Sequence, residues 1–325
     1  MKVCIFGAGA IGGALGVHLA RGGHDVSLVA RGPHLEAIRA RGLTLRYKDK
    51  TDETTVRLPA GDDPAQFGPQ DLVVIGVKAH GVPAILPRLK RLLGPETIVL
   101  PALNGIPWWY FHKAGGKYDG QPVRCLDPDG AMLQALDPGR ILGCVVHGAG
   151  DVPAPGVVRQ TSPDQPLIVG EPDGTESPRL VALANALAVP GMKIATDRDI
   201  RSSIWTKLLG NVAFNPVSAL AKADMQLIAN HGRLNGLVRS MMTEAVAVGR
   251  AHGVGFAMTV DQRLAMAGRL GPVKPSMLQD AEQNRPMEVE AIVGAVVELA
   301  RLENVQTPTI DVVYALISGR DATLR

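Results

Sequence analysis

The glycine pattern near the start of the chain constrains its fold more than any other feature. Gly7, Gly9 and Gly12 have the spacing G-x-G-x-x-G and directly follow the apolar run Val3-Cys4-Ile5-Phe6. The run predicts a buried strand, and the glycines permit a tight turn that brings the backbone close to a pyrophosphate. The amides at the start of the next helix would point at that anion. We therefore predict a dinucleotide-binding βαβ unit whose cofactor contacts are Gly7, Ala8, Gly9, Ala10, Ile11 and Gly12.

The end of the second predicted strand indicates which dinucleotide binds. Units that bind NAD usually carry Asp or Glu about 20 residues after the glycines, where it bonds the ribose 2′-hydroxyl. Here Val26–Val29 is followed by Ala30 and Arg31, with no acid. A guanidinium can bind a 2′-phosphate through two parallel hydrogen bonds, whereas a carboxylate would repel it. Arg31 therefore favours NADPH over NADH, with a solvated surface charge as the alternative.

Length and composition narrow the class of protein further. A chain of 325 residues with 46% apolar residues is long enough for two domains. The 34 basic and 31 acidic residues are well mixed, which argues against a nucleic-acid partner. Three scattered cysteines fit a reducing compartment, and no Cys or His cluster suggests a metal. Since no apolar run reaches the roughly 18 residues of a membrane span, we expect a cytoplasmic protein.

The order of strand and helix signals predicts two different domains. Strands and helices alternate through the first half, for example at Val26–Val29, Pro33–Arg41 and Leu72–Val77, which is typical of a parallel sheet covered on both faces. Short strands between Ile141 and Ala195 are expected to extend this sheet antiparallel at its edge. After Asp197 the periodicity becomes helical. We predict an α/β Rossmann-type domain over residues 1–197 and an all-α domain over residues 198–325.

Two polar residues stand at the predicted carboxyl ends of strands. Ligands of open α/β sheets bind outside these ends. Lys78 terminates the apolar run Leu72–Val77, and Asn104 follows the run Thr97–Leu100. Both are candidate ligand contacts. A solvated lysine and a plain Asn104-Gly105 turn are the respective alternatives.

The second predicted domain contains a polar stripe on one helix. Lys207, Asn211 and Asn215 have the spacing i, i+4, i+8, which aligns them on one helix face. Asparagine is a poor helix former because its side chain competes for backbone hydrogen bonds, so two aligned asparagines favour a face that binds a ligand. A polar surface stripe is the alternative.

Two further polar residues have purely structural explanations as well. Ser276 and Gln279 have the spacing of a capping box. Pro286 suits the first turn of a helix, in which Glu288 would complement the helix dipole. Local pattern therefore leaves the roles of Ser276 and Glu288 open.

Taken together, these motifs resemble the ketopantoate reductase family, the 2-dehydropantoate 2-reductases, along essentially the whole chain. The resemblance lies in the order and spacing of six pieces, namely the fingerprint with Arg31, Val77-Lys78-Ala79, Asn104-Gly105, Pro155-Gly156-Val157-Val158, Trp205–Pro216, and Ser276–Asp280 followed by Glu288. It implies a Rossmann-type domain followed by a helical one, with the site in the cleft between them. It further implies NADPH-dependent reduction of ketopantoate to pantoate, a step of pantothenate biosynthesis.

The resemblance also implies a role for each matching residue. Lys207 would be the general acid that protonates the carbonyl oxygen as hydride reaches the carbon, which agrees with the chemistry of an ammonium beside a developing alkoxide. Asn211, Asn215 and Ser276 would hold the substrate, and Asn104 would bridge substrate and nicotinamide. Glu288 would bind the nicotinamide ribose and orient Lys207, while Lys78 would lie near the cofactor.

The chain departs from better-known members of the family in two places. Asn104-Gly105 continues into an aromatic stretch that contains Trp108 and Trp109, and Met225 stands where some members have another substrate-contacting asparagine. If a ring faces the substrate, the substrate could be a different α-keto acid; packing of these rings in the core is the alternative. A noncatalytic NADPH-sensing protein is an alternative of another class, and the many alanines and valines of the helical domain suggest a possible homodimer.

Overall fold

The chain forms two compact units. The computed structural model describes residues 1–48, 53–161 and 164–324. Unit 1 comprises residues 1–103, 111–120 and 131–200, and unit 2 comprises residues 104–110, 121–130 and 201–325. The chain therefore passes from unit 1 to unit 2 for the last time after Ile200. Two short segments from within the predicted first domain belong to unit 2.

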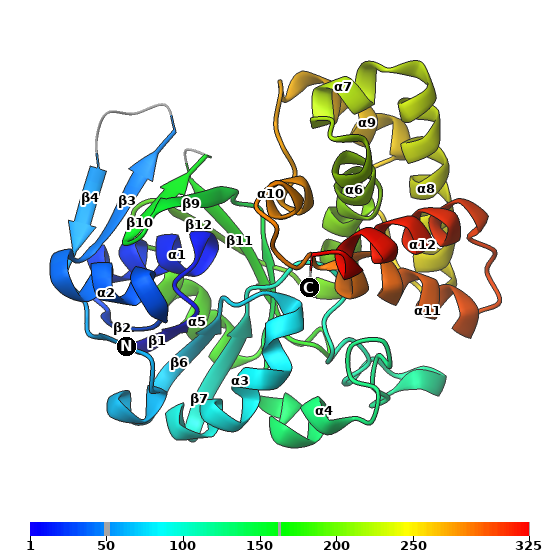
Figure 1. Ribbon diagram of the computed structural model, residues 1–325. Helices are drawn as coiled ribbons and strands as arrows, with labels where there is room; N and C mark the ends of the chain where they lie inside the picture. The colour runs from blue at the N-terminus through cyan, green and yellow to red at the C-terminus, as the bar shows by residue number, and fades with distance from the viewer. Residues whose placement is uncertain (49–52, 162–163, 325) are drawn as a thin grey trace. The chain divides into compact units, whose positions relative to one another are not determined.

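Unit 1 is built on a parallel sheet (Figure 1). Its strands have the order β5-β2-β1-β6-β7, and every pair is parallel. Since β1 pairs with β2 on one side and β6 on the other, the strand order reverses at β1, which is where doubly wound sheets bind ligands. The elements are β1 Lys2–Phe6, α1 Ala10–Arg21, β2 Asp25–Val29, α2 Gly32–Arg41, β5 Ala60–Gly61, β6 Gln70–Ile75, α3 Val82–Leu89 and β7 Leu93–Pro101. The predicted Rossmann-type fold is confirmed.

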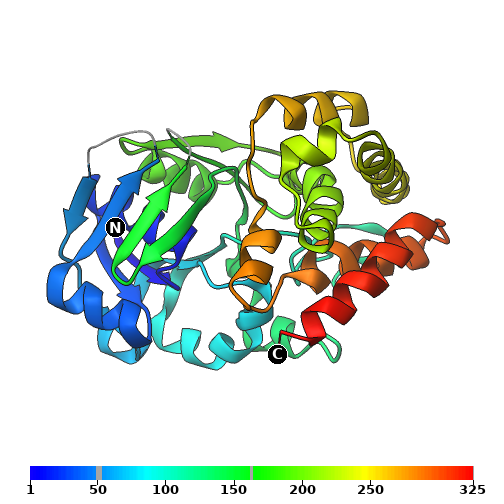
Figure 2. The ribbon, with the colours of Figure 1, turned by 45° about the horizontal axis from the view of Figure 1, so that its top comes forward.

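The later strands of unit 1 do not extend this sheet antiparallel at its edge, contrary to the expectation from sequence, although Ile141 forms an isolated parallel bridge with Val99 of β7. They join two smaller sheets, of order β4-β3-β10-β9 and β12-β11-β8. The β9–β10 hairpin pairs with β3 and lies on α1, where the side chain of Val158 occupies the space beside Gly13. Figure 2 shows this hairpin beside β3 and β4. The strands are β3 Leu43–Tyr47, β4 Glu53–Val56, β8 Gly143–Val146, β9 Gly150–Ala154, β10 Val157–Gln160, β11 Gln165–Gly170 and β12 Met192–Thr196, with helices α4 Ala131–Ala135 and α5 Pro178–Leu187.

Unit 2 carries the helical domain, as predicted. Its helices are α6 Ile200–Ala221, α7 Met225–Asn230, α8 Gly232–Ala251, α9 Val260–Arg269, α10 Ser276–Glu282, α11 Ala295–Leu302 and α12 Pro308–Ala322. Glu290–Gly294 forms a π-helical turn that leads into α11, in place of the α-helical start that the sequence suggests. The core includes Trp205, whose indole N–H donates to the hydroxyl of Tyr110 at 2.8 Å. In the part of the chain that the structure describes, no helix is both long enough and apolar enough to cross a bilayer.

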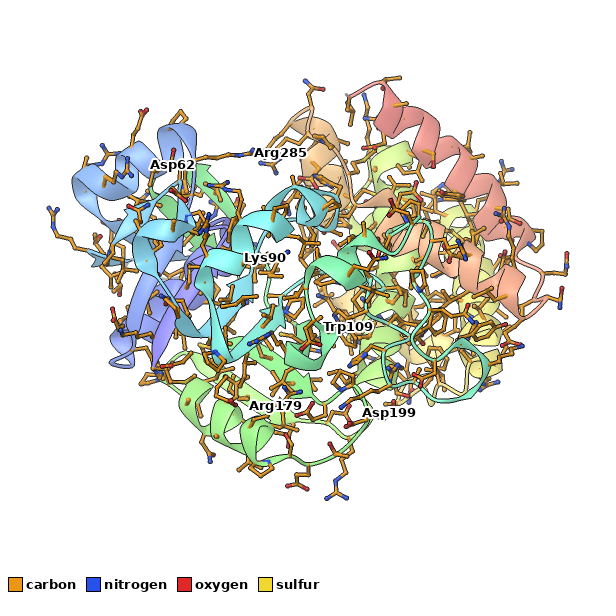
Figure 3. The ribbon with its side chains drawn as sticks, turned by 90° about the horizontal axis from the view of Figure 1, so that it is seen from below. Asp62, Lys90, Trp109, Arg179, Asp199 and Arg285 are labelled. Carbon is orange, nitrogen blue, oxygen red and sulfur yellow. The ribbon has the colours of Figure 1, made fainter. Side chains whose placement is uncertain are left out.

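A buried carboxylate ties the first turn of α5 to the strand before it. Glu171 is 2% exposed and accepts two hydrogen bonds from the Arg179 guanidinium, at 2.7 and 2.6 Å, and one from the Ser177 hydroxyl. Arg179 is labelled on α5 in Figure 3. Burial raises the pKa of the Glu171 carboxyl, but the hydrogen bonds from Arg179 and Ser177 outweigh it, so the net pKa is lowered. Folding stability gained from this group is therefore present above the unfolded-state pKa and lost as the pH falls.

Replacement of Arg179 by leucine should destabilise unit 1 in a pH-dependent way. It leaves a buried carboxylate without its cation, which we expect to cost about 3 kcal/mol at pH 7. The loss should shrink towards pH 4, where protonation neutralises the carboxyl. Urea unfolding at both pH values measures this, with Arg198→Leu as the control because its ion pair with Glu176 is exposed. An equal loss for Arg179→Leu at both pH values would contradict the proposed electrostatic origin.

Candidate functional site

The fingerprint glycines serve two different needs. Gly7 has φ +107°, and a Cβ there would lie 2.7 Å from the backbone nitrogen of Val77. A Cβ on Gly12 would lie 2.1 Å from the Gly7 carbonyl oxygen. These two glycines are therefore required by the protein's own packing. A Cβ on Gly9, in contrast, would meet nothing within 4 Å, so the backbone before α1 faces open space. This loop fits a ligand pyrophosphate that approaches Gly9 and the amides of α1.

A histidine that the sequence analysis did not single out holds this loop. The Nδ1 atom of His34 accepts the Gly156 N–H at 3.0 Å, so its Nε2 carries the proton and donates to the Ala8 carbonyl at 2.8 Å. His34 thus links the fingerprint to the β9–β10 turn. No sequence signal identifies this role, because the turn and the fingerprint lie about 150 residues apart.

The two other candidate cofactor residues of unit 1 follow neighbouring strands. Arg31 follows β2 and is exposed at the residue before α2, and among the described residues its guanidinium has no hydrogen-bond or ion-pair partner. Lys78 follows β6 and is partly buried. Gly76, which lies between β6 and Lys78, packs so tightly on the fingerprint that its Cβ would lie 2.7 Å from the Gly7 carbonyl oxygen. Both candidates therefore lie at the carboxyl end of the sheet, near the fingerprint.

The predicted polar stripe lies on one helix, α6. Lys207 and Asn211 are partly buried, and Asn215 is 4% exposed. Beside the stripe, the guanidinium of Arg263 from α9 fills the space at Gly210 and lies 5.7 Å from the ring centre of Phe214. Burial lowers the pKa of Arg263.

Asn104 brings two of the candidate residues of unit 2 together. The Lys207 ammonium donates a hydrogen bond to Asn104 Oδ1 at 2.6 Å, and Asn104 Nδ2 donates to Glu288 Oε2 at 3.3 Å. Glu288 is 7% exposed. The amide thus lies between a cation and a carboxylate and bonds each with the appropriate end. Such an arrangement holds the ammonium in one position.

At Ser276 and at Glu288, the first residues of the helices differ from those expected. The capping box predicted for Ser276 and Gln279 is absent, because Ser276 is the first residue within α10 and Gln279 donates instead to the Lys274 carbonyl at 2.9 Å. Ser276 is exposed, and within the described ranges its hydroxyl has no hydrogen-bond partner. Glu288 precedes the helical turn rather than lying inside it, and the preceding amide, of Met287, donates to buried Asp321 at 2.7 Å. The Ser276 side chain therefore does not cap α10.

The two tryptophans after Asn104 are core residues. Trp108 and Trp109 are 2% and 1% exposed, and over the described residues their indole N–H groups have no hydrogen-bond acceptor. These rings therefore pack in the core, which was the alternative to a position facing the substrate. Met225 is 8% exposed at the start of α7, where its amide donates to the Val273 carbonyl.

These features define a class of protein. A doubly wound sheet with a glycine fingerprint provides a dinucleotide site. A lysine held by an amide, which itself bonds a carboxylate, can transfer a proton to an oxygen. A dinucleotide and a proton donor are the two requirements of a nicotinamide-dependent oxidoreductase.

Comparison with known proteins supports this class and identifies the family. The family model Ketopantoate reductase PanE/ApbA matches residues 3–114, and the model for the C-terminal domain of the same family matches residues 199–321. The 2-dehydropantoate 2-reductase of Mesorhizobium japonicum is 45% identical over 98% of this chain and 97% of its own length. That of Halobacterium salinarum is 29% identical over 98% of both chains. The chain belongs to the ketopantoate reductase family and is an oxidoreductase.

Solved structures agree with this assignment. A protein of Ralstonia solanacearum MolK2 assigned to the ketopantoate reductases has a TM-score of 0.92 at 36% identity, over 99% of this chain and 98% of its own. A complex of D-mandelate dehydrogenase with NADH and anilino(oxo)acetate has a TM-score of 0.83 at 21% identity, which shows a shared fold. It covers 100% of this chain and 99% of its own. The enzymes of this family depend on NAD or NADP.

Proposed function

We propose that this protein reduces 2-dehydropantoate to pantoate with NADPH, in pantothenate biosynthesis, and that Lys207 is the general acid. The observation that carries the proposal is the hydrogen-bonded series from Lys207 through Asn104 to Glu288. The 45% identity to a 2-dehydropantoate 2-reductase along nearly the whole chain supports the choice of substrate.

In the proposed reaction, the ammonium of Lys207 protonates the substrate's carbonyl oxygen. When bound, NADPH would supply the hydride for the carbonyl carbon. As the hydride arrives, negative charge develops on the oxygen, and an adjacent ammonium both stabilises this charge and donates the proton. Lys207 is then neutral and regains a proton from water. The Glu288 carboxylate accepts a hydrogen bond from the Asn104 amide and so helps to hold the amide that binds the ammonium.

The remaining candidates receive binding roles in this proposal. Asn211 and Asn215 hold the hydroxyl or carboxylate of the substrate, and the hydroxyl of Ser276, exposed at the start of α10, binds the carboxylate. Asn104 contacts both substrate and nicotinamide, and Glu288 the nicotinamide ribose. The pyrophosphate binds at residues 7–12, with Lys78 near the cofactor and Arg31 on the 2′-phosphate. The exposed Arg31 guanidinium supports this last role.

The cellular setting is also part of the proposal. We expect a cytoplasmic enzyme, which the free thiols of Cys4, Cys125 and Cys144 support. A homodimer is supported by a ketopantoate reductase of Staphylococcus aureus that is described as dimeric. On α12, the exposed side chains of Val312 and Leu316 lie one turn apart and would suit such a contact.

Removal of the Lys207 amine tests the chemical role. Lys207→Ala should lower kcat by about 10²- to 10⁴-fold, because a positioned general acid contributes that much. The Kd for NADPH, measured by fluorescence titration, should stay near the wild-type value. Lys222→Ala, at an exposed lysine just beyond α6, is the matched control and should keep full turnover. Normal kcat in Lys207→Ala would refute the assignment.

Reversal of the charge at Arg31 tests the choice of cofactor. Arg31→Glu should weaken NADPH binding, because a carboxylate repels the 2′-phosphate and can bond a 2′-hydroxyl. The preference of the enzyme for NADPH over NADH should therefore become smaller or reverse. Dissociation constants for both dinucleotides measure the effect. Arg41→Glu places the same charge at the exposed end of α2 and should leave the preference unchanged. An unchanged preference in Arg31→Glu would remove the basis for NADPH.

A panel of branched α-keto acids assayed with NADPH tests the substrate. Ketopantoate should give the highest kcat/KM, since the asparagine stripe offers partners for its hydroxyl as well as its carboxylate. If another keto acid is preferred, the enzyme has a different substrate, an alternative that Met225 in place of an asparagine favours. Tight NADPH binding without turnover of any keto acid would favour a noncatalytic sensor.

A further inference from the structure

We infer that Gly105 is a positioning residue for this reaction, which acts by docking the Asn104 loop against the backbone of Ala291. The inference rests on the proposed function, because it explains how the amide of Asn104 reaches both Lys207 and Glu288. All of these residues belong to unit 2.

The loop after Asn104 lies directly on a backbone carbonyl. The Ile106 N–H donates to the Ala291 carbonyl oxygen at 2.8 Å. Gly105 has φ +82°, and a Cβ there would lie 2.1 Å from that oxygen and 2.4 Å from its carbon. The obstructing atoms are backbone, which cannot rotate away as the end of a side chain can. Position 105 therefore requires glycine for two reasons, its conformation and its contact.

The π-helical turn explains why this carbonyl accepts a bond from outside the helix. In a regular α-helix, the Ala291 carbonyl would accept the amide of Ala295, four residues later. Here the Ala295 amide donates to the Glu290 carbonyl instead. The wider turn at Glu290–Gly294 thus leaves the Ala291 carbonyl for the Ile106 N–H. Turns of this kind occur often at functional sites.

The contact fixes the distance between Asn104 and Glu288. Ala291 lies three residues after Glu288, so one short backbone stretch carries the carboxylate and the carbonyl that docks the loop. The amide of Asn104 then bonds Glu288 and Lys207 with its two ends. A side chain at position 105 would push the loop away by about 1 Å, a shift that can cost about 10²-fold in rate.

A pair of glycine variants tests the inference. Gly105→Ala should lower kcat at saturating substrate and cofactor by about 10²-fold. Gly253→Ala is the matched control, since Gly253 has φ +78° in the same unit but a Cβ there would meet nothing within 4 Å. The control should keep wild-type kcat although it suffers the same backbone strain. Equal kcat for the two variants would overturn the inference.

A double-mutant cycle separates positioning from general structural damage. If Gly105 acts through Asn104, the double variant Asn104→Ala with Gly105→Ala should be no slower than Asn104→Ala alone. Losses that multiply would overturn the inference while the proposed function stands. Failure of the proposed function would be recognised by a different result, normal turnover in Lys207→Ala. That result would overturn both the proposed function and this inference. Should Gly105→Ala not fold, Ile106→Pro carries the test, because it removes the donated N–H without a Cβ at position 105.

Discussion

The amide of Asn104, held between a lysine and a buried carboxylate, is the interaction on which this site depends. The amide bonds both charged groups, the Lys207 ammonium at 2.6 Å and the Glu288 carboxylate at 3.3 Å. The hydrogen bond to Asn104 thereby orients the Lys207 ammonium. In the proposed reaction, this neutral side chain would hold the general acid in a fixed position.

That arrangement depends in turn on backbone rather than on side chains. Gly105 and the π-helical turn let the Asn104 loop lie on the Ala291 carbonyl, and the Met287 amide is anchored by buried Asp321. In unit 1 the same principle applies to the fingerprint, where Gly7 and Gly12 allow contacts that no Cβ would tolerate. Both halves of the proposed chemistry are therefore positioned by glycines at close backbone contacts.

Patterns local to one element could be predicted from the sequence, and patterns between distant elements could not. The fingerprint after a buried strand identified the Rossmann-type sheet, and the i, i+4, i+8 spacing put Lys207, Asn211 and Asn215 on one helix. The pairing of β8 to β12 was misjudged because short strands carry no signal for their partners. The capping box at Ser276 failed because its spacing also occurs one residue inside a helix. The roles of His34 and Ala291 arise from contacts with Gly156 and Ile106, which lie 122 and 185 residues away in the sequence. Periodicity within one sequence does not indicate such contacts.

Chemical rescue tests the central claim, that a primary amine at position 207 donates the proton, most directly. Methylammonium added to Lys207→Ala can occupy the space of the missing ammonium and donate in its place. The account predicts that turnover of this variant rises with methylammonium concentration and saturates, while turnover of the wild-type enzyme does not change. If turnover of the variant stays at its basal level over the whole concentration range while NADPH binds normally, the proton comes from another group and the account is wrong.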